Sequence, residues 1–232
     1  MIQHPQGGLV LKKKKQGIDP DALFASRFSA FPEWIKLGEY DFEDLLFSDD
    51  EIKTENLYGL TFTRCIFRRC RMSQAQFGTV RFEEVVFEDC DCPGARFSDS
   101  SWLGCTLSGC RLVGAKLSGA RFRKVRFQDC AAKYANFDRA AFTNVSFDSC
   151  GFQDAYFRAC RFKDQTISGC SFLLANFCQT SLAGLDFTTS EIGGWTLSEG
   201  VAELRGAVVT PVQAVELAER CGLVVKSPEG LE

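Results

Sequence analysis

The chain has 232 residues, of which 45% are hydrophobic and 25% are charged, and its formal net charge is −3. No apolar run approaches the roughly 18 residues that a membrane-spanning helix needs, and the first residues lack the apolar segment typical of a signal peptide. A pI near 5.4 disfavours direct nucleic-acid binding. Twelve cysteines without an export signal indicate free thiols in a reducing compartment, so we expect a cytoplasmic protein.

The N-terminal part of the chain falls into two predicted segments. Residues 1–18, which include four consecutive lysines at 12–15, are typical of a disordered tail. Residues 19–39 indicate a helical cap, with Asp19 as the N-cap and Pro20 at the first helical position. Four aromatic residues recur at three- and four-residue spacing and are expected to cover the core: Phe24, Phe28, Phe31 and Trp34.

The central part of the chain repeats every five residues. From Phe42 to Leu197 every fifth residue is apolar, without one insertion. Two positions before each of these centres stands a smaller residue, mostly Ala, Val, Cys or Leu, and the other three positions are mainly polar or Gly. Neither an α-helix nor a strand has this period. Two inward residues in five indicate a backbone that turns a corner in each repeat, coils and stacks on itself.

A longer period of twenty residues shows how many repeats make one coil. At twenty-residue spacing the row of small residues contains six successive cysteines: Cys70, Cys90, Cys110, Cys130, Cys150 and Cys170. The next column has an alanine in every coil from Ala75 to Ala175. Four faces per coil explain both columns, because identical side chains then lie above one another. Residues 40–199 would make about eight coils.

These residues resemble the pentapeptide-repeat family, whose repeat has a central Leu or Phe and a small residue two positions before it. The resemblance covers residues 40–199 and implies an all-β fold, a right-handed quadrilateral β-helix. Short capping helices are expected at both ends, because stacked folds need atypical terminal units.

The C-terminal segment, residues 200–230, is predicted to close the rod. Trp195 stands in the row of small residues and is expected to plug the last coil. A helix follows, with Thr210 as its N-cap, Pro211 at its first position and Gly222 as its stop signal.

Catalytic chemistry has little support in the sequence. The one histidine, His4, lies in the predicted tail, so no Ser-His-Asp set can be assembled around it. The enzymatic alternative is a glycosidase-like β-helix with a carbohydrate trough. The cysteine column places parallel side chains on one wall, whereas zinc needs converging ligands. We therefore expect no cofactor and no metal. Cys178 is the expected reactive thiol, and Cys221 is expected on the buried side of the last helix.

Charges alternate in sign along the first three coils and yield one candidate site. The predicted partner-binding acidic patch comprises Asp41, Glu43, Asp44, Glu83, Glu84, Glu88, Asp89 and Asp91. Two basic clusters stand beside it: Arg64, Arg68, Arg69 and Arg71, and then Arg121, Arg123, Lys124 and Arg126. The alternative interpretation is mutual neutralisation between stacked coils.

The family resemblance implies two functions that differ in kind. Its best-understood members protect DNA gyrase and topoisomerase IV from quinolones or toxins by mimicking DNA, and the terminal segment 207–225 is similar to the closing helix of the mycobacterial quinolone-resistance subgroup. That similarity implies a homodimer through Val212, Val215, Leu217 and Leu223. The alternative is a rigid scaffold that binds another protein without acting on a topoisomerase.

Overall fold

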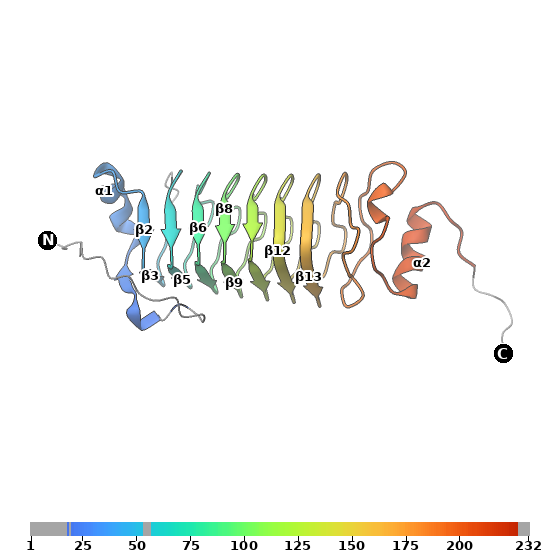
Figure 1. Ribbon diagram of the computed structural model, residues 1–232, viewed down its shortest axis with the longest axis horizontal. Helices are drawn as coiled ribbons and strands as arrows, with labels where there is room; N and C mark the ends of the chain where they lie inside the picture. The colour runs from blue at the N-terminus through green and yellow to red at the C-terminus, as the bar shows by residue number, and fades with distance from the viewer. Residues whose placement is uncertain (1–17, 19, 53–56, 227–232) are drawn as a thin grey trace.

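The protein is a straight rod of parallel coils with a helical segment at each end (Figure 1). The computed structural model describes residues 18, 20–52 and 57–226. The predictions for the N-terminal tail up to residue 17 and for Asp19 as a helix cap fall outside the described residues. Strands mark seven turns of the coil, and residues 181–199 continue it for one more turn without strands. The predicted all-β quadrilateral β-helix is therefore confirmed.

The N-terminal cap differs from the single predicted helix. It consists of a 3-10 helix η1 (Pro20–Ala22), strand β1 (Phe24–Ser26), a 3-10 helix η2 (Phe28–Ala30) and helix α1 (Phe31–Lys36). Strand β1 pairs with the first coil and so satisfies backbone groups that a helix would leave open. Phe28 and Phe31 are buried as predicted, but Phe24 is 62% exposed.

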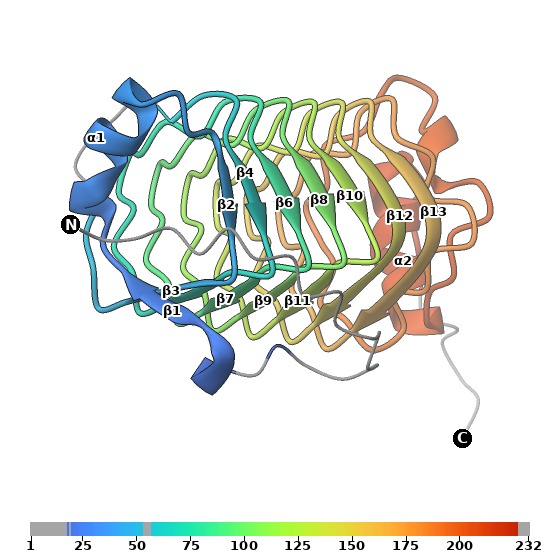
Figure 2. The ribbon, with the colours of Figure 1, turned by 60° about the vertical axis from the view of Figure 1, so that its left-hand side comes forward.

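Two adjacent faces of the rod carry the strands. Face 1 contains β2 (Asp41–Glu43), β4 (Thr61–Thr63), β6 (Arg81–Glu83), β8 (Ser101–Leu103) and β10 (Arg121–Arg123). Face 2 contains β3 (Leu45–Ser48), β5 (Ile66–Arg68), β7 (Val86–Glu88), β9 (Thr106–Ser108) and β11 (Arg126–Gln128). Strands β12 (Ala141–Asp148) and β13 (Arg161–Ser168) cross both faces, as Figure 2 shows.

From β2 onward, every strand pairs in parallel with the strand twenty residues away, so each side chain lies directly above its equivalent in the next coil. Faces 3 and 4, whose inward centres begin at Ile52 and Leu57, consist of turns joined by single bridges such as Arg71↔Asp91 and Arg96↔Lys116. A residue with positive φ ends nearly every repeat, for example Arg64 at 50° and Lys124 at 56°. These left-handed residues make the corners that the five-residue period requires.

Stacked aromatic rings fill the inside of the rod. Phe47 and Phe67 stack with centroids 5.0 Å apart and planes 9° from parallel, and rings on adjacent faces meet edge to face. Trp102 replaces a phenylalanine in the face 1 column, and its indole N–H donates to the hydroxyl of Ser100 at 2.7 Å. Most coils have an apolar small residue at the position of Ser100. The serine hydroxyl here accepts the hydrogen bond that the buried indole N–H of Trp102 needs.

The C-terminal end closes the rod in a different way. A 3-10 helix η3 (Ala202–Leu204) and helix α2 (Pro211–Arg220) follow the last coil. On faces 1 and 2 the last coil pairs outward, because Leu182, Gly184 and Phe187 donate to residues 203–208. Among the described residues, no backbone hydrogen bond joins β13 to residues 181–188. The outer edge of β13 is therefore open, and we call this place the seam.

Within the described residues, no helix has the length and apolar character needed to cross a membrane.

Candidate interaction surfaces

Outward side chains of the first four coils are joined by ion pairs between neighbouring coils. Arg69 contacts Asp49 at 2.6 Å, Arg111 contacts Asp91 at 2.6 Å, and Arg71 contacts Glu51 at 3.2 Å. Each pair spans twenty residues, because stacking in register puts the arginine directly above the carboxylate of the coil before. The predicted neutralisation between stacked coils is confirmed for this half of the rod.

The predicted acidic patch is divided and largely neutralised. Five of its eight carboxylates have an arginine partner: Glu43 and Asp44 (Arg64), Glu83 (Arg81), Glu88 (Arg68) and Asp91 (Arg111). Asp41, Glu84 and Asp89 are exposed and have no ion pair among the described residues. The eight residues also lie on three faces, because each step of five positions turns a corner. They do not form one continuous acidic surface.

Two of the paired groups, Asp49 and Arg64, have pKa values shifted in favour of their charged forms. A hydrogen bond from Arg69 lowers the pKa of the Asp49 carboxyl below its ordinary value. A hydrogen bond to Asp44, and a further one to Glu43, raise the pKa of Arg64. Asp49 and Arg64 thus keep their charge at neutral pH, and their pairs restrict side chains that would otherwise move freely.

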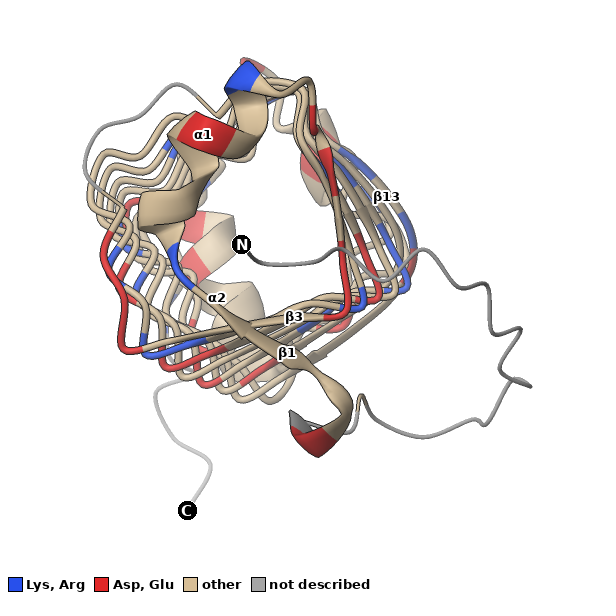
Figure 3. Ribbon diagram, turned by 90° about the vertical axis from the view of Figure 1, so that its left-hand side faces the viewer, with Lys and Arg blue, Asp and Glu red and all other residues tan. Residues whose placement is uncertain are grey.

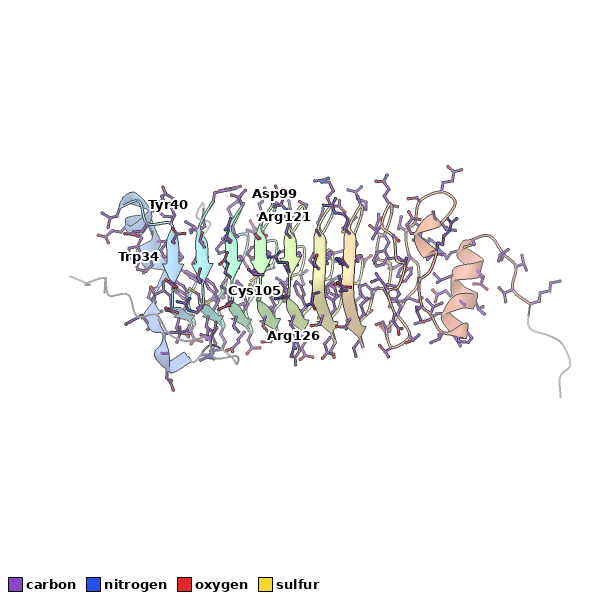
Figure 4. The ribbon with its side chains drawn as sticks, viewed as in Figure 1. Trp34, Tyr40, Asp99, Cys105, Arg121 and Arg126 are labelled. Carbon is purple, nitrogen blue, oxygen red and sulfur yellow. The ribbon has the colours of Figure 1, made fainter. Side chains whose placement is uncertain are left out.

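The second half of the rod carries basic residues without such partners. Arg121, Arg123, Lys124 and Arg126 on one coil, and Arg161 and Lys163 two coils later, are all exposed. None of them has an ion pair within residues 18, 20–52 and 57–226. Figure 3 shows Lys and Arg gathered on the face that bears the β13 label, and Figure 4 shows Arg121 and Arg126 on their shared coil.

The cysteine column forms part of the core. All twelve cysteines are free thiols and ten of them are buried. The thiols of Cys90 and Cys110 donate to the carbonyl oxygens of Phe67 and Phe87 at 3.2 and 3.5 Å, which explains a small residue with a weak donor at these positions. In the part of the chain that the structure describes, no group of three His, Cys, Asp or Glu converges on a metal site.

The comparison with known families decides the identity of the coil. The family described as pentapeptide repeat region matches residues 60–137, and the pentapeptide repeats family of eight copies matches residues 126–164. The chain is a pentapeptide-repeat protein. No curated protein matches it significantly.

A solved structure of a pentapeptide repeat protein shows the same fold. HetL, a pentapeptide repeat protein involved in heterocyst differentiation regulation from Nostoc sp. strain PCC 7120, superposes with a TM-score of 0.54 at 14% identity. The match covers 79% of this chain and 92% of HetL. QnrB1, a plasmid-mediated fluoroquinolone resistance protein, gives a TM-score of 0.39 at 22% identity, over 80% of this chain and 90% of its own. At 14% identity the likeness to HetL shows the fold alone.

The C-terminal cap of this pentapeptide-repeat protein begins and ends as predicted. Thr210 and Gln213 form a reciprocal capping box, Pro211 is the first residue of α2, and Gly222 follows the helix with a φ of 82°. The Gln213 side chain also donates to the carbonyl of Phe187 at 3.0 Å and that of Ser190 at 2.8 Å, which fastens the helix to the last coil.

The predicted dimer residues, three in α2 and one just after it, divide into two groups. Val212, Val215 and Leu223 are 81%, 44% and 62% exposed, whereas Leu217 is only 8% exposed and belongs to the core of this chain. Leu217 therefore cannot line an interface, because it already covers the last coil below it. Cys221 is also exposed, against the prediction, because it is the C-cap residue at the end of the helix.

A shallow depression of about 340 Å³ lies between α2 and the last coil. Trp195 and residues 197–201 form one wall, and Arg220 and Cys221 form the other. Arg220 is held there by a hydrogen bond of 2.8 Å from its guanidinium to the carbonyl of Trp195.

Proposed function

We propose that this pentapeptide-repeat protein is a rigid, non-enzymatic scaffold of the cytoplasm that binds a protein partner. One observation supports the proposal: stacking in register holds the outward side chains of four flat faces at fixed spacings. A fixed array of side chains loses little conformational entropy when a partner binds.

Site-specific photocrosslinking in cells tests the scaffold proposal. A photoreactive amino acid is placed at one exposed position on each face: Arg123, Gln128, Tyr134 and Tyr156. A scaffold should crosslink one discrete protein from one face or from two adjacent faces. Equal labelling from all four positions, or labelling from none, would contradict the proposal.

A second candidate function is protection of DNA gyrase or topoisomerase IV from a quinolone or toxin. The similarity of the α2 segment to the closing helix of the quinolone-resistance subgroup supports it. A DNA mimic must present negative charge, and in this protein Asp41, Glu84 and Asp89 are the patch carboxylates without an arginine partner among the described residues. These three residues would therefore carry the contact.

A supercoiling assay tests the topoisomerase hypothesis. The protein is titrated into gyrase with and without ciprofloxacin, beside the variant Glu84→Gln/Asp89→Asn. We expect inhibition of supercoiling or rescue from the drug with the natural protein, and a weaker effect with the variant. If neither supercoiling nor drug inhibition changes, the topoisomerase hypothesis is wrong and only the scaffold proposal remains.

The same helix supports a homodimer joined end to end. Val212 and Leu223 expose apolar surface at the tip of the rod, and a closed dimer would bring the two copies of this surface together. We expect light scattering to give a dimer for the natural chain and a monomer for Val212→Asp. Ala131→Asp, an exposed change on face 3, is the control and should stay dimeric. A monomeric natural chain, or a dimeric Val212→Asp variant, would contradict this interface.

A further inference from the structure

We infer that face 1 in the second half of the rod is a docking site for an extended, acidic protein segment. The inference rests on the proposed scaffold function and names the partner of that scaffold. Four exposed bases define the site, which we call the basic frame: Arg121, Arg123, Arg161 and Lys163.

The strand register places the four bases around two small residues. Arg121, Ala141 and Arg161 lie side by side on three successive strands, and so do Arg123, Thr143 and Lys163. Arg121 and Arg123 form one basic row on β10, and Arg161 and Lys163 form the other on β13. Strands in a sheet are about 4.8 Å apart, so the two rows are about 10 Å apart, and the two bases within a row are about 7 Å apart. Ala141 and Thr143 are half-buried and form the floor between the rows.

The first four coils show which contacts these bases lack, namely ion pairs with carboxylates of a neighbouring coil. In the first four coils several arginines are neutralised by a carboxylate one coil away, as in Arg111–Asp91 and Arg68–Glu88. Around the frame the equivalent positions are uncharged: Ser101 and Leu103 before it, Ala141 and Thr143 inside it, and Ser181 and Ala183 after it. No carboxylate therefore stands one coil away from any base of the frame, and carboxylates of a partner would supply the missing ion pairs.

Charge is concentrated on this part of the face. On its three coils, five bases, including Lys124, stand against one carboxylate, Asp164 at the adjoining corner. Every one of the five bases is exposed and has no ion pair among the described residues. Charged side chains arranged in this way attract a partner of opposite sign and set its orientation.

The spacing fits an extended peptide with acidic residues at alternate positions. Such a peptide presents carboxylates about 7 Å apart on one side, which matches Arg121 to Arg123 and Arg161 to Lys163. If the peptide lies along β12 over Ala141 and Thr143, each of its carboxylates can contact one base from each row. Arginine binds carboxylates in a bidentate fork, which favours a defined register.

A nucleic acid fits this face less well. Farther along the same face, Glu84 is exposed without an ion pair among the described residues and would repel a long polyanion, and the net charge of the chain is −3. Face 1 also has no aromatic residue at its outward positions between 121 and 164, so bases would find no stacking partner there. A short acidic segment touches only the frame and avoids both problems.

Fluorescence anisotropy with a labelled peptide of four Ser-Glu repeats tests the inference on the full chain. We expect binding at low salt that weakens as salt rises. Arg123→Ser/Lys163→Ser should weaken it about tenfold or more, because one base is lost from each row. Thr143→Glu should weaken it similarly, because the new carboxylate pairs with the frame from inside. Gln153→Glu adds the same charge to face 3 of the same coil and should leave binding unchanged.

Three results would overturn the inference: no peptide binding, equal binding by all variants, or tighter binding of a labelled twelve-nucleotide single-stranded DNA. The last would assign the frame to nucleic acid. Thermal melting shows whether each variant is folded, and Thr143→Glu should melt no lower than the natural chain. If the peptide fails to bind but photocrosslinks arise from another face, the scaffold function stands and only the basic frame is lost.

Discussion

Arg158 binds the buried carboxylate of Asp138 with both its backbone and its side chain. Its backbone N–H donates to Oδ1 at 3.1 Å, and its Nε donates to Oδ2 at 3.0 Å, with a further bond from Nη2. Asp138 is 3% exposed, although the arginine side chain remains half exposed. The hydrogen bond to Asp138 raises the pKa of Arg158 above its ordinary value. This pair fastens two coils of face 4 in the half of the rod where Arg121, Arg123, Arg161 and Lys163 have no ion pair among the described residues.

We predict that Asp138→Ala lowers the free energy of unfolding by about 1–3 kcal/mol, because the Arg158 N–H loses its acceptor in a buried place. Urea denaturation measures the change. Asp49→Ala removes the exposed partner of Arg69 and should cost much less, since solvent screens exposed pairs. Equal losses in the two variants would show that burial of Asp138 does not matter.

The repeat explains why the rod itself was predictable from sequence. A strict five-residue period assigns every residue between Phe42 and Leu197 to the inside or the outside, and identical columns assign it to a face. The ion pairs were also readable, because Asp49 and Arg69, or Asp91 and Arg111, stand twenty residues apart in the same column.

The ends of the rod were less predictable, because the repeat no longer constrains them. Phe24 has helical spacing to Phe28 but lies in a strand, since an open sheet edge nearby needs a backbone partner. Leu217 looks equivalent to Val212 on a helix, yet it is buried because α2 lies against the last coil. Which carboxylates remain unpaired depends on side-chain conformations, and the repeat pattern of the sequence does not determine these.

The burial of ten of the twelve cysteines predicts how the folded chain reacts with a thiol reagent. Burial raises the pKa of Cys65 and of Cys105 to about 12, so these thiols stay protonated at pH 8 and are shielded from reagents. We expect Ellman's reagent to react quickly with Cys221 and more slowly with half-buried Cys178, and to reach the other ten only after denaturation.

The variant Cys221→Ser is the control for the fast reaction and should remove it. If three or more thiols react quickly in the natural, folded chain, the cysteine column is not the closed part of the core that the structure shows.

The seam beside β13 predicts an interruption in amide protection. The N–H groups of Phe162, Asp164 and Ile167 point toward the last coil but have no backbone acceptor in the described part of the chain. Their equivalents in β12, such as Phe142 and Phe147, pair with β13. We expect the three seam amides to exchange hydrogen at least about a hundredfold faster than the β12 amides.

Residue-resolved hydrogen exchange by NMR measures this difference, and the β12 amides are the control within the same molecule. Protection of the seam amides equal to that of β12 would mean that the last coil closes on β13 in solution.

Glu203 makes the C-terminal cap sensitive to acid. Its Oε1 accepts from the backbone N–H of Gln179 at 2.8 Å and of Ser198 at 3.2 Å, and the side chain is buried. Burial alone would raise the pKa of Glu203, but the hydrogen bonds from Ser198 and Gln179 outweigh it and lower the pKa below its ordinary value of 4.5. A carboxyl group whose pKa is lower in the folded chain stabilises the fold above that ordinary value, and the contribution disappears as the pH falls through the folded pKa.

We therefore predict that Glu203→Gln melts about 2–4 °C lower than the natural chain at pH 7, for a loss of about 1 kcal/mol. The gap should narrow as the pH falls below 4.5, because the natural chain then loses the same contribution by protonation. Calorimetry at a series of pH values measures both curves. Glu199→Gln, a change at an exposed glutamate nearby, should follow the natural curve throughout. A gap between Glu203→Gln and the natural chain that stays constant down to acid pH would contradict the role assigned to the carboxylate.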